Sequence, residues 1–141
     1  MNDIKSEVAR LASSAVEMLQ ERAPNLDFSQ KSLSQIEEVL EEASNYADEL
    51  PDQHVSTLAQ QVGCYILEVA HRQFGGNFFW HDQLNQPVLV VGEPEKHIAL
   101  ATWDKVRGRI SGDPADNIPF FYDGFEERVK TSMPGTKALY L

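Results

Sequence analysis

Residues 63–92, GCYILEVAHRQFGGNFFWHDQLNQPVLVVG, decide the fold class of this chain. Apolar positions in the first part recur at helical spacing. The pair Gly75-Gly76 that follows is typical of a helix C-terminus, because glycine readily adopts the left-handed conformation found there. The aromatic segment 78–81 and the apolar segment 88–91 flank a polar turn, which predicts a β-hairpin. A buried helix that leads directly into a hairpin indicates an α+β fold.

The chain on either side of this unit predicts further helices and one more strand. Pro24 and Pro51 bound the first two helices, because a proline disfavours helical conformation in the residue before it. The predicted helices cover residues 4–23, 33–50, 53–74, 103–110 and 118–129, and the predicted strands cover 78–81, 88–91 and 97–101. The tail, residues 138–141, is apolar enough to dock as a short strand.

We therefore expect one α+β domain over residues 1–141, with a small antiparallel sheet of about three strands and helices packed mainly on one face. The N-terminal helix within residues 1–24 is a candidate addition to the core domain. Gly63 lies in the middle of the most apolar helix, where glycine costs about 1 kcal/mol relative to alanine. We infer that another backbone segment or an aromatic ring approaches the helix closely at Gly63.

Charge is the unusual feature of the composition. The 141 residues carry a net charge of −10, which argues against nucleic acid and against anionic membrane surfaces as ligands. The charge permits a basic protein partner, and it equally suits a chain that stays soluble through self-repulsion. The N-terminus lacks the apolar core of a signal peptide, and no apolar run approaches the roughly 18 residues of a membrane span. We expect a cytoplasmic protein.

The acidic residues are concentrated between Ser32 and His71, where there are eight of them and no lysine or arginine. Four lie mainly off the apolar stripe of the second predicted helix and are the candidate partner-binding residues: Glu38, Glu41, Glu42 and Glu49. Like charges four residues apart on a helix destabilise it, so the cluster serves either solubility or a basic partner that offsets the repulsion. Solubility is the simpler explanation of the cluster, and a basic protein partner is the function that we prefer if the cluster has a binding role.

A second candidate site combines Glu68, His71 and Arg72 with Trp80. The first three are three and four residues apart on the third predicted helix and can share one helix edge. A carboxylate beside a histidine can steady a base, and an arginine can hold an anionic group, so this set predicts small-molecule binding or hydrolysis near the hairpin. An ordinary ion pair at the edge of the core explains the same residues without any activity.

The sequence predicts neither a metal site nor a cofactor. The four histidines match no common zinc spacing, and the single cysteine, Cys64, lies among apolar residues, where an inert buried thiol is expected. No nucleophile elbow occurs, and Gly75-Gly76 follows a helix, which is the wrong context for a phosphate-binding loop. These features favour a function other than catalysis.

Several short segments carry a resemblance to a group of small bacterial domains with no assigned activity. The segments are Asp27-Phe28-Ser29, Ser32-Leu33, Gly63-Cys64-Tyr65, Glu68-Val69, Gly75-Gly76, Phe79-Trp80 and Trp103-Asp104-Lys105-Val106. The resemblance covers roughly residues 27–129. Some of these domains resemble proteins encoded beside toxins or secretion systems, so the resemblance implies an immunity- or chaperone-like role and no catalytic residue.

Overall fold

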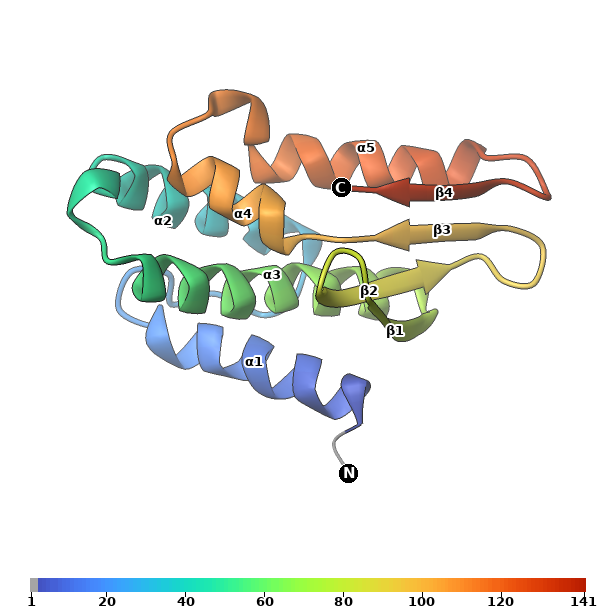
Figure 1. The fold of residues 1–141 in the computed structure, drawn as a ribbon, viewed down its shortest axis with the longest axis horizontal. Coiled ribbons are helices and arrows are strands. Elements are labelled where there is room, and N and C mark those ends of the chain that lie inside the picture. Colours follow the sequence, from blue (N-terminus) through green and yellow to red (C-terminus); the bar gives the residue numbers. More distant parts are fainter. Residues whose placement is uncertain (1–2) are drawn as a thin grey trace.

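The computed structural model describes residues 3–141, which form five α-helices and a four-stranded mixed sheet (Figure 1). The helices are α1 (Ile4–Met18), α2 (Leu33–Ser44), α3 (Asp52–Phe74), α4 (Trp103–Ile110) and α5 (Ile118–Thr131), with single 3-10 turns at Gln30–Ser32, Ala47–Glu49 and Pro114–Asp116. The strands are β1 (Asn77–His81), β2 (Gln86–Val91), β3 (His97–Leu100) and β4 (Lys137–Tyr140). The predicted α+β class is confirmed.

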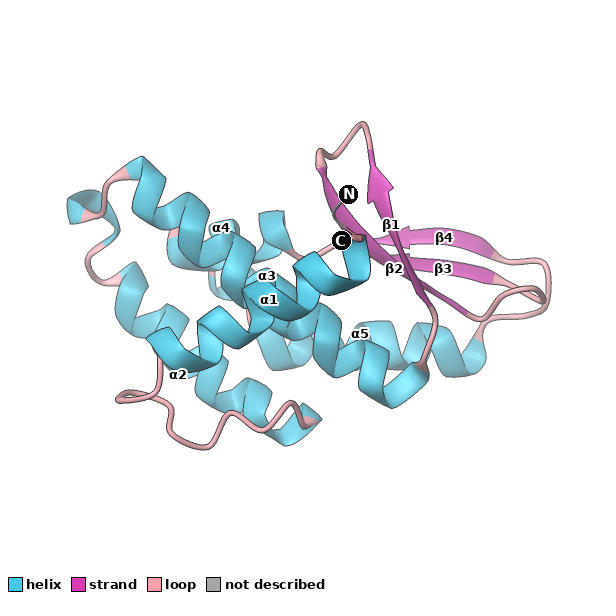
Figure 2. Ribbon diagram, turned by 90° about the horizontal axis from the view of Figure 1, so that it is seen from below, coloured by secondary structure: helices cyan, strands magenta, loops and turns pink. Residues whose placement is uncertain are grey.

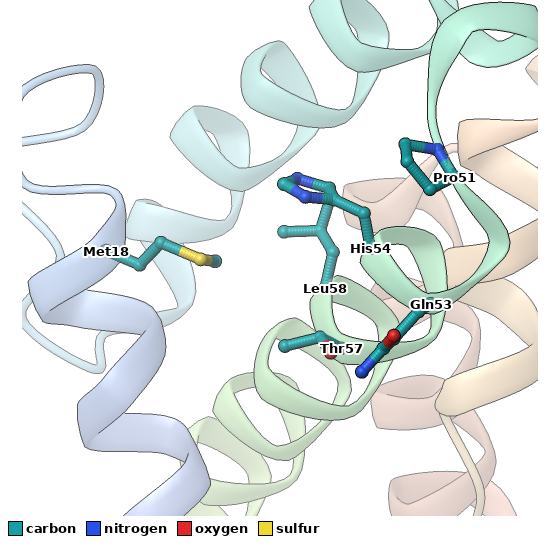
Figure 3. Close-up of a pocket in the computed structure, with 6 residues that line it drawn as sticks. All are labelled: Met18, Pro51, Gln53, His54, Thr57 and Leu58. Carbon is teal, nitrogen blue, oxygen red and sulfur yellow. The ribbon is translucent and has the colours of Figure 1, made fainter.

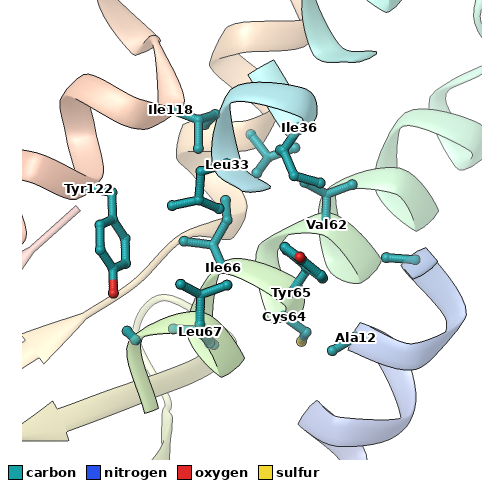
Figure 4. Close-up of a cluster of buried hydrophobic side chains, with 14 of the residues drawn as sticks. Ala12, Leu33, Ile36, Val62, Cys64, Tyr65, Ile66, Leu67, Ile118 and Tyr122 are labelled. Atoms are coloured by element: carbon teal, nitrogen blue, oxygen red, sulfur yellow. The ribbon is translucent and has the colours of Figure 1, made fainter. Parts of the chain in front are cut away.

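Helix α3 is the centre of the molecule and is most completely buried in its middle. Residues 62–67 are all buried, and those six include the large side chains of Tyr65, Ile66 and Leu67. Helix α1 packs along one side of α3, and Figure 4 shows the core residues of α2 and α5 on the other side. Ser32 shares a 2.6 Å hydrogen bond with the Tyr65 hydroxyl, so the polar tip of this side chain has a partner inside the core.

The sheet has the order β1-β2-β3-β4, and its first three strands form the predicted antiparallel meander. The C-terminal tail adds β4 beside β3, and these two strands are parallel. The prediction of an antiparallel sheet of about three strands is therefore correct for β1 to β3 and wrong for β4. Parallel neighbours require a crossover connection, and α4 and α5 supply it by carrying the chain back to the start of β3.

The two faces of the sheet differ in what covers them (Figure 2). Leu89, Leu100 and Tyr140 lie opposite one another on one face, and Tyr140 packs 5.2 Å from the Phe121 ring of α5, measured between ring centroids. This face belongs to the main hydrophobic core. The other face holds a separate small cluster, formed by Val88, Val90, Ala99 and Ala101 with Leu84 from the hairpin turn. The helices thus pack on one face of the sheet.

Helix α2 is shorter than predicted and is fixed by a buried ion pair. It ends at Ser44, and a 3-10 turn rather than a helix leads to Pro51, because the chain must reverse direction there to begin α3. Glu37 points inward from α2, where it accepts a 2.7 Å hydrogen bond from Arg109 of α4 and a 3.0 Å bond from the backbone N–H of Ile118. One carboxylate therefore joins α2 to α4 and α5.

Gly63 meets an aromatic ring, as the sequence predicted. The Trp103 ring lies where a Cβ atom on Gly63 would point, and the Thr102 hydroxyl donates a 2.7 Å hydrogen bond to the Gly63 carbonyl. We expect Gly63→Leu to lower the free energy of unfolding by more than about 2 kcal/mol, because the added side chain displaces the ring. Urea unfolding measures this change, and a variant as stable as the parent would show that α4 can move away from α3 without cost.

The Glu37–Arg109 pair predicts a large effect of a single substitution. The two side chains are only 12% and 8% exposed, so Arg109→Ala leaves a carboxylate largely buried without its partner. We expect a loss of about 3 kcal/mol in the free energy of unfolding. Arg107→Ala is the matched control on the same helix, because Arg107 pairs with Asp104 at the surface and should contribute at most about 1 kcal/mol. Similar losses in the two variants would contradict a structural role for the buried pair.

The burial of three ionisable side chains predicts that the free energy of unfolding falls at alkaline pH. Burial raises the pKa of the Cys64 thiol to about 12 and also raises the pKa of the Tyr65 and Tyr122 hydroxyls. In the unfolded chain these groups lose their protons near pH 8.5 and 10, so the folded state binds more protons and rising pH favours unfolding. We expect the urea midpoint to fall between pH 8 and 10, and to fall less in Cys64→Ala. An equal fall in both proteins would exclude the thiol as a cause.

Candidate functional site

A groove opens where the end of α1, the end of α2 and the start of α3 meet. It consists of two adjoining hollows of about 330 and 370 Å³, which share Met18, His54 and Leu58. Figure 3 shows Met18 reaching from α1 toward His54 and Leu58 on α3. We call this feature the acidic groove; it is lined by Met18, Leu19, Glu21, Arg22, Val39, Ala43, Tyr46, Leu50, Pro51, Gln53, His54, Thr57 and Leu58.

The bottom of the acidic groove is apolar, and two of its apolar side chains are open to solvent. Val39 and Leu58 are buried and belong to the main core, whereas Met18 is 45% exposed and Tyr46 is 56% exposed. Met18 is the last residue of α1 and lies one position before the buried Leu19, so it falls outside the apolar stripe that faces α3. Large apolar side chains exposed side by side mark a surface suited to binding another molecule.

Acidic residues surround this apolar bottom. Glu42 stands at the rim, because it pairs at 3.4 Å with Arg22, which lines the groove; Glu21 is a lining residue itself. Glu38 lies one turn before Glu42 on α2 and is exposed. Within residues 3–141, Arg22 is the only lysine or arginine that lines either hollow. The lining itself balances one carboxylate, Glu21, against one guanidinium, Arg22, and the excess negative charge comes from the exposed carboxylates of α2 next to it.

The four acidic residues predicted from the sequence are all exposed, but they do not stand equally close to the groove. Helical geometry puts Glu42 next to Val39, while Glu41 points farther around α2. Glu49 lies on the 3-10 turn that follows α2 and not on the helix itself, which corrects its predicted setting. These four residues, Glu38, Glu41, Glu42 and Glu49, are called the acidic quartet below.

The structure separates the residues of the second candidate site: Glu68, His71 and Arg72 lie apart from the cavity that Trp80 lines. Glu68 and His71 lie next to each other on α3, with 3.4 Å between the Glu68 Oε1 and His71 Nδ1 atoms, and both side chains are largely buried. The Arg72 guanidinium stacks on the ring of Phe28 at 4.0 Å. This packing closes the loop before α2 onto α3.

Trp80 lines a cavity between α1, the hairpin and the start of α4. Its ring meets the Trp103 ring edge-on, with 6.4 Å between the centroids, beside a cavity of about 320 Å³. The residues that line this cavity are Ile4, Glu7, Val8, Leu11, Gln60, Trp80, Asn85, Pro87 and Trp103. Since Glu68, His71 and Arg72 are not among them, the carboxylate and the histidine do not share the Trp80 cavity.

Comparisons of the chain with protein-family models, with curated proteins and with solved structures find no match. Residues 3–141 contain no group of three or more histidine, cysteine, aspartate or glutamate side chains placed to hold a metal ion. In the same part of the chain, no helix has both the length and the apolar character needed to span a membrane.

Sequence reasoning missed the apolar part of the acidic groove. Met18, Tyr46 and His54 come from three separate segments, and nothing in the pattern of any one segment shows that they meet. One signal was available. Met18 and Leu19 are adjacent, so only one of these two large apolar side chains can lie on the buried stripe of α1.

Proposed function

We propose that this protein is a non-enzymatic, cytoplasmic, protein-binding domain that holds a basic amphipathic segment of a partner in the acidic groove. One observation carries the proposal: the exposed apolar side chains of Met18 and Tyr46 line a groove next to the exposed carboxylates of α2. An immunity- or chaperone-like role, which the sequence resemblance implies, is compatible with such a groove, because both roles depend on binding another protein.

The two parts of the groove would make different contributions to binding. Burying the apolar bottom supplies most of the affinity, as in other grooves that accept the apolar face of a helix. The surrounding carboxylates attract a basic segment from a distance and select against acidic ones. A partner segment with lysine or arginine beside large apolar residues at helical spacing satisfies both parts.

A synthetic peptide tests the apolar part. The probe is an 18-residue fluorescent peptide with leucine and lysine at amphipathic helical spacing, and its control replaces every lysine with glutamate. We expect saturable binding of the basic peptide and none of the acidic one, followed by fluorescence anisotropy. Met18→Lys should weaken binding about tenfold, whereas Phe120→Lys should not, since Phe120 is 75% exposed on α5, outside the groove. Equal weakening by the two variants would mean that the peptide senses only net charge.

The acidic quartet predicts how fast a basic partner associates. Replacing Glu38, Glu41, Glu42 and Glu49 with glutamine should slow association of the lysine-rich peptide about tenfold at low salt, because opposite charges accelerate encounter. The same change should flatten the dependence of the rate on salt concentration, since salt screens these charges. Stopped-flow fluorescence measures both quantities, and the fold should stay intact or become slightly more stable as repulsion is relieved.

The matched control removes the same amount of charge elsewhere. Its substitutions replace four exposed acidic residues outside the groove with their amides: Glu93, Glu95, Asp123 and Glu127. This variant should associate at close to the parental rate and keep the parental salt dependence. If the quartet variant behaves like this control, the acidic quartet provides solubility alone.

A further inference from the structure

Strand β1 is an edge of the sheet whose sequence contains none of the residues that usually protect an edge. The strand order leaves β1 and β4 at the two edges, and the sequence of β1 is Asn-Phe-Phe-Trp-His, with no charged residue and no proline. Natural proteins commonly protect an edge strand with lysine, proline or a covering element, because its unpaired backbone groups otherwise recruit another strand. The other edge, β4, follows this rule, since it carries Lys137.

The open edge of β1 exposes aromatic side chains on both faces of the sheet. Phe79 is 46% exposed on the outer face, where it lies opposite Val88. Trp80 is 45% exposed and points to the inner face, since alternate residues of a strand point to opposite sides. Within residues 3–141, the backbone of β1 makes no hydrogen bond outside its ladder with β2, so its outward N–H and C=O groups have no backbone partner, although the start of α1 packs beside this strand.

We propose that β1 pairs antiparallel with β1 of a second copy of this chain, which joins the two sheets into one. The sequence of β1 is chemically self-complementary about Phe79. With Phe79 of one copy opposite Phe79 of the other, Phe78 falls opposite Trp80 and Asn77 opposite His81. Aromatic side chains then face aromatic side chains on both faces of the joined sheet, and polar residues face each other at the ends. Cross-strand aromatic pairs of this kind stabilise antiparallel strands.

The distribution of charge allows two chains of net charge −10 to meet at this edge. The acidic groove lies at the end of the molecule formed by the start of α3 and the end of α2, whereas β1 lies at the opposite end (Figure 1). The same register puts Asp82 opposite Gly76 of the other copy, so no like charges face each other next to the paired strands. This dimer leaves the acidic groove of each copy free and does not depend on the proposed function.

A cysteine at position 79, the residue that faces itself in the proposed dimer, tests the pairing and its register. Directly opposed residues in an antiparallel pair have Cα atoms about 4.5–5.5 Å apart, which is within the range that a disulfide needs. The Phe79→Cys variant should therefore form a covalent dimer within minutes of mild oxidation. Leu139→Cys is the matched control, because Leu139 is 41% exposed on the other edge strand and should stay uncrosslinked over the same time. Cys64 is fully buried and contributes to neither result.

The mass of the unmodified protein supplies the second test. Sedimentation equilibrium at protein concentrations of about 50 μM should give twice the chain mass of 15.9 kDa. Phe79→Lys, which puts two like charges opposite each other, should give the monomer mass, while Leu139→Lys should remain dimeric; circular dichroism checks the fold of each. A monomeric parent protein at about 1 mM would overturn the proposal. Crosslinking of Leu139→Cys as fast as Phe79→Cys would also overturn it.

Discussion

The contact between Gly63 and Trp103 sets the position of most other elements. Residues 62–67 of helix α3 are all buried, and α4 can approach the helix closely because Gly63 has no side chain at the contact. Thr102, directly before Trp103, donates its hydroxyl to the Gly63 carbonyl, and the Trp103 backbone N–H donates to the Gln86 side chain of β2 at 3.1 Å. The start of α4 is therefore tied both to the central helix and to the hairpin. The cost of glycine within a helix is offset by this close packing.

The central position of α3 also explains why its first turns form part of a groove. Most residues of α3 between 58 and 70 are buried, with α1, α4 and β2 packed against the helix, whereas residues 52–54 are exposed. The ends of α1 and α2 lie beside these exposed turns and leave a hollow between three chain segments. Carboxylates around such a hollow remain in water, so their charges need no internal partner. Glu37 is the contrasting case, because it is largely buried and is held by Arg109.

The two ends of the molecule differ in their chemistry. One end carries the acidic groove, with exposed apolar side chains beside the carboxylates of α2. The other end carries an uncharged edge strand with aromatic residues on both faces. A dimer formed through that strand would leave the acidic groove of each copy free. Such an arrangement would bind a partner with two or more basic segments more strongly than a single copy would, because the second contact becomes intramolecular.

The sequence by itself determined the features that depend on neighbouring residues in the chain. The spacing of apolar residues revealed α3, the glycine pair marked its end, and the hairpin followed from its turn. The exposure of Glu38, Glu41 and Glu42 followed from their place off the apolar stripe of α2. Only the tertiary structure decided that β4 runs parallel to β3, that Glu37 turns inward to Arg109, and that Trp80 and His71 do not share a cavity. Local periodicity reports which side of an element is buried, but it carries no information about which distant segment covers that side. The acidic groove shows this limit, since Met18, Tyr46 and His54 meet only once three separate elements have packed together.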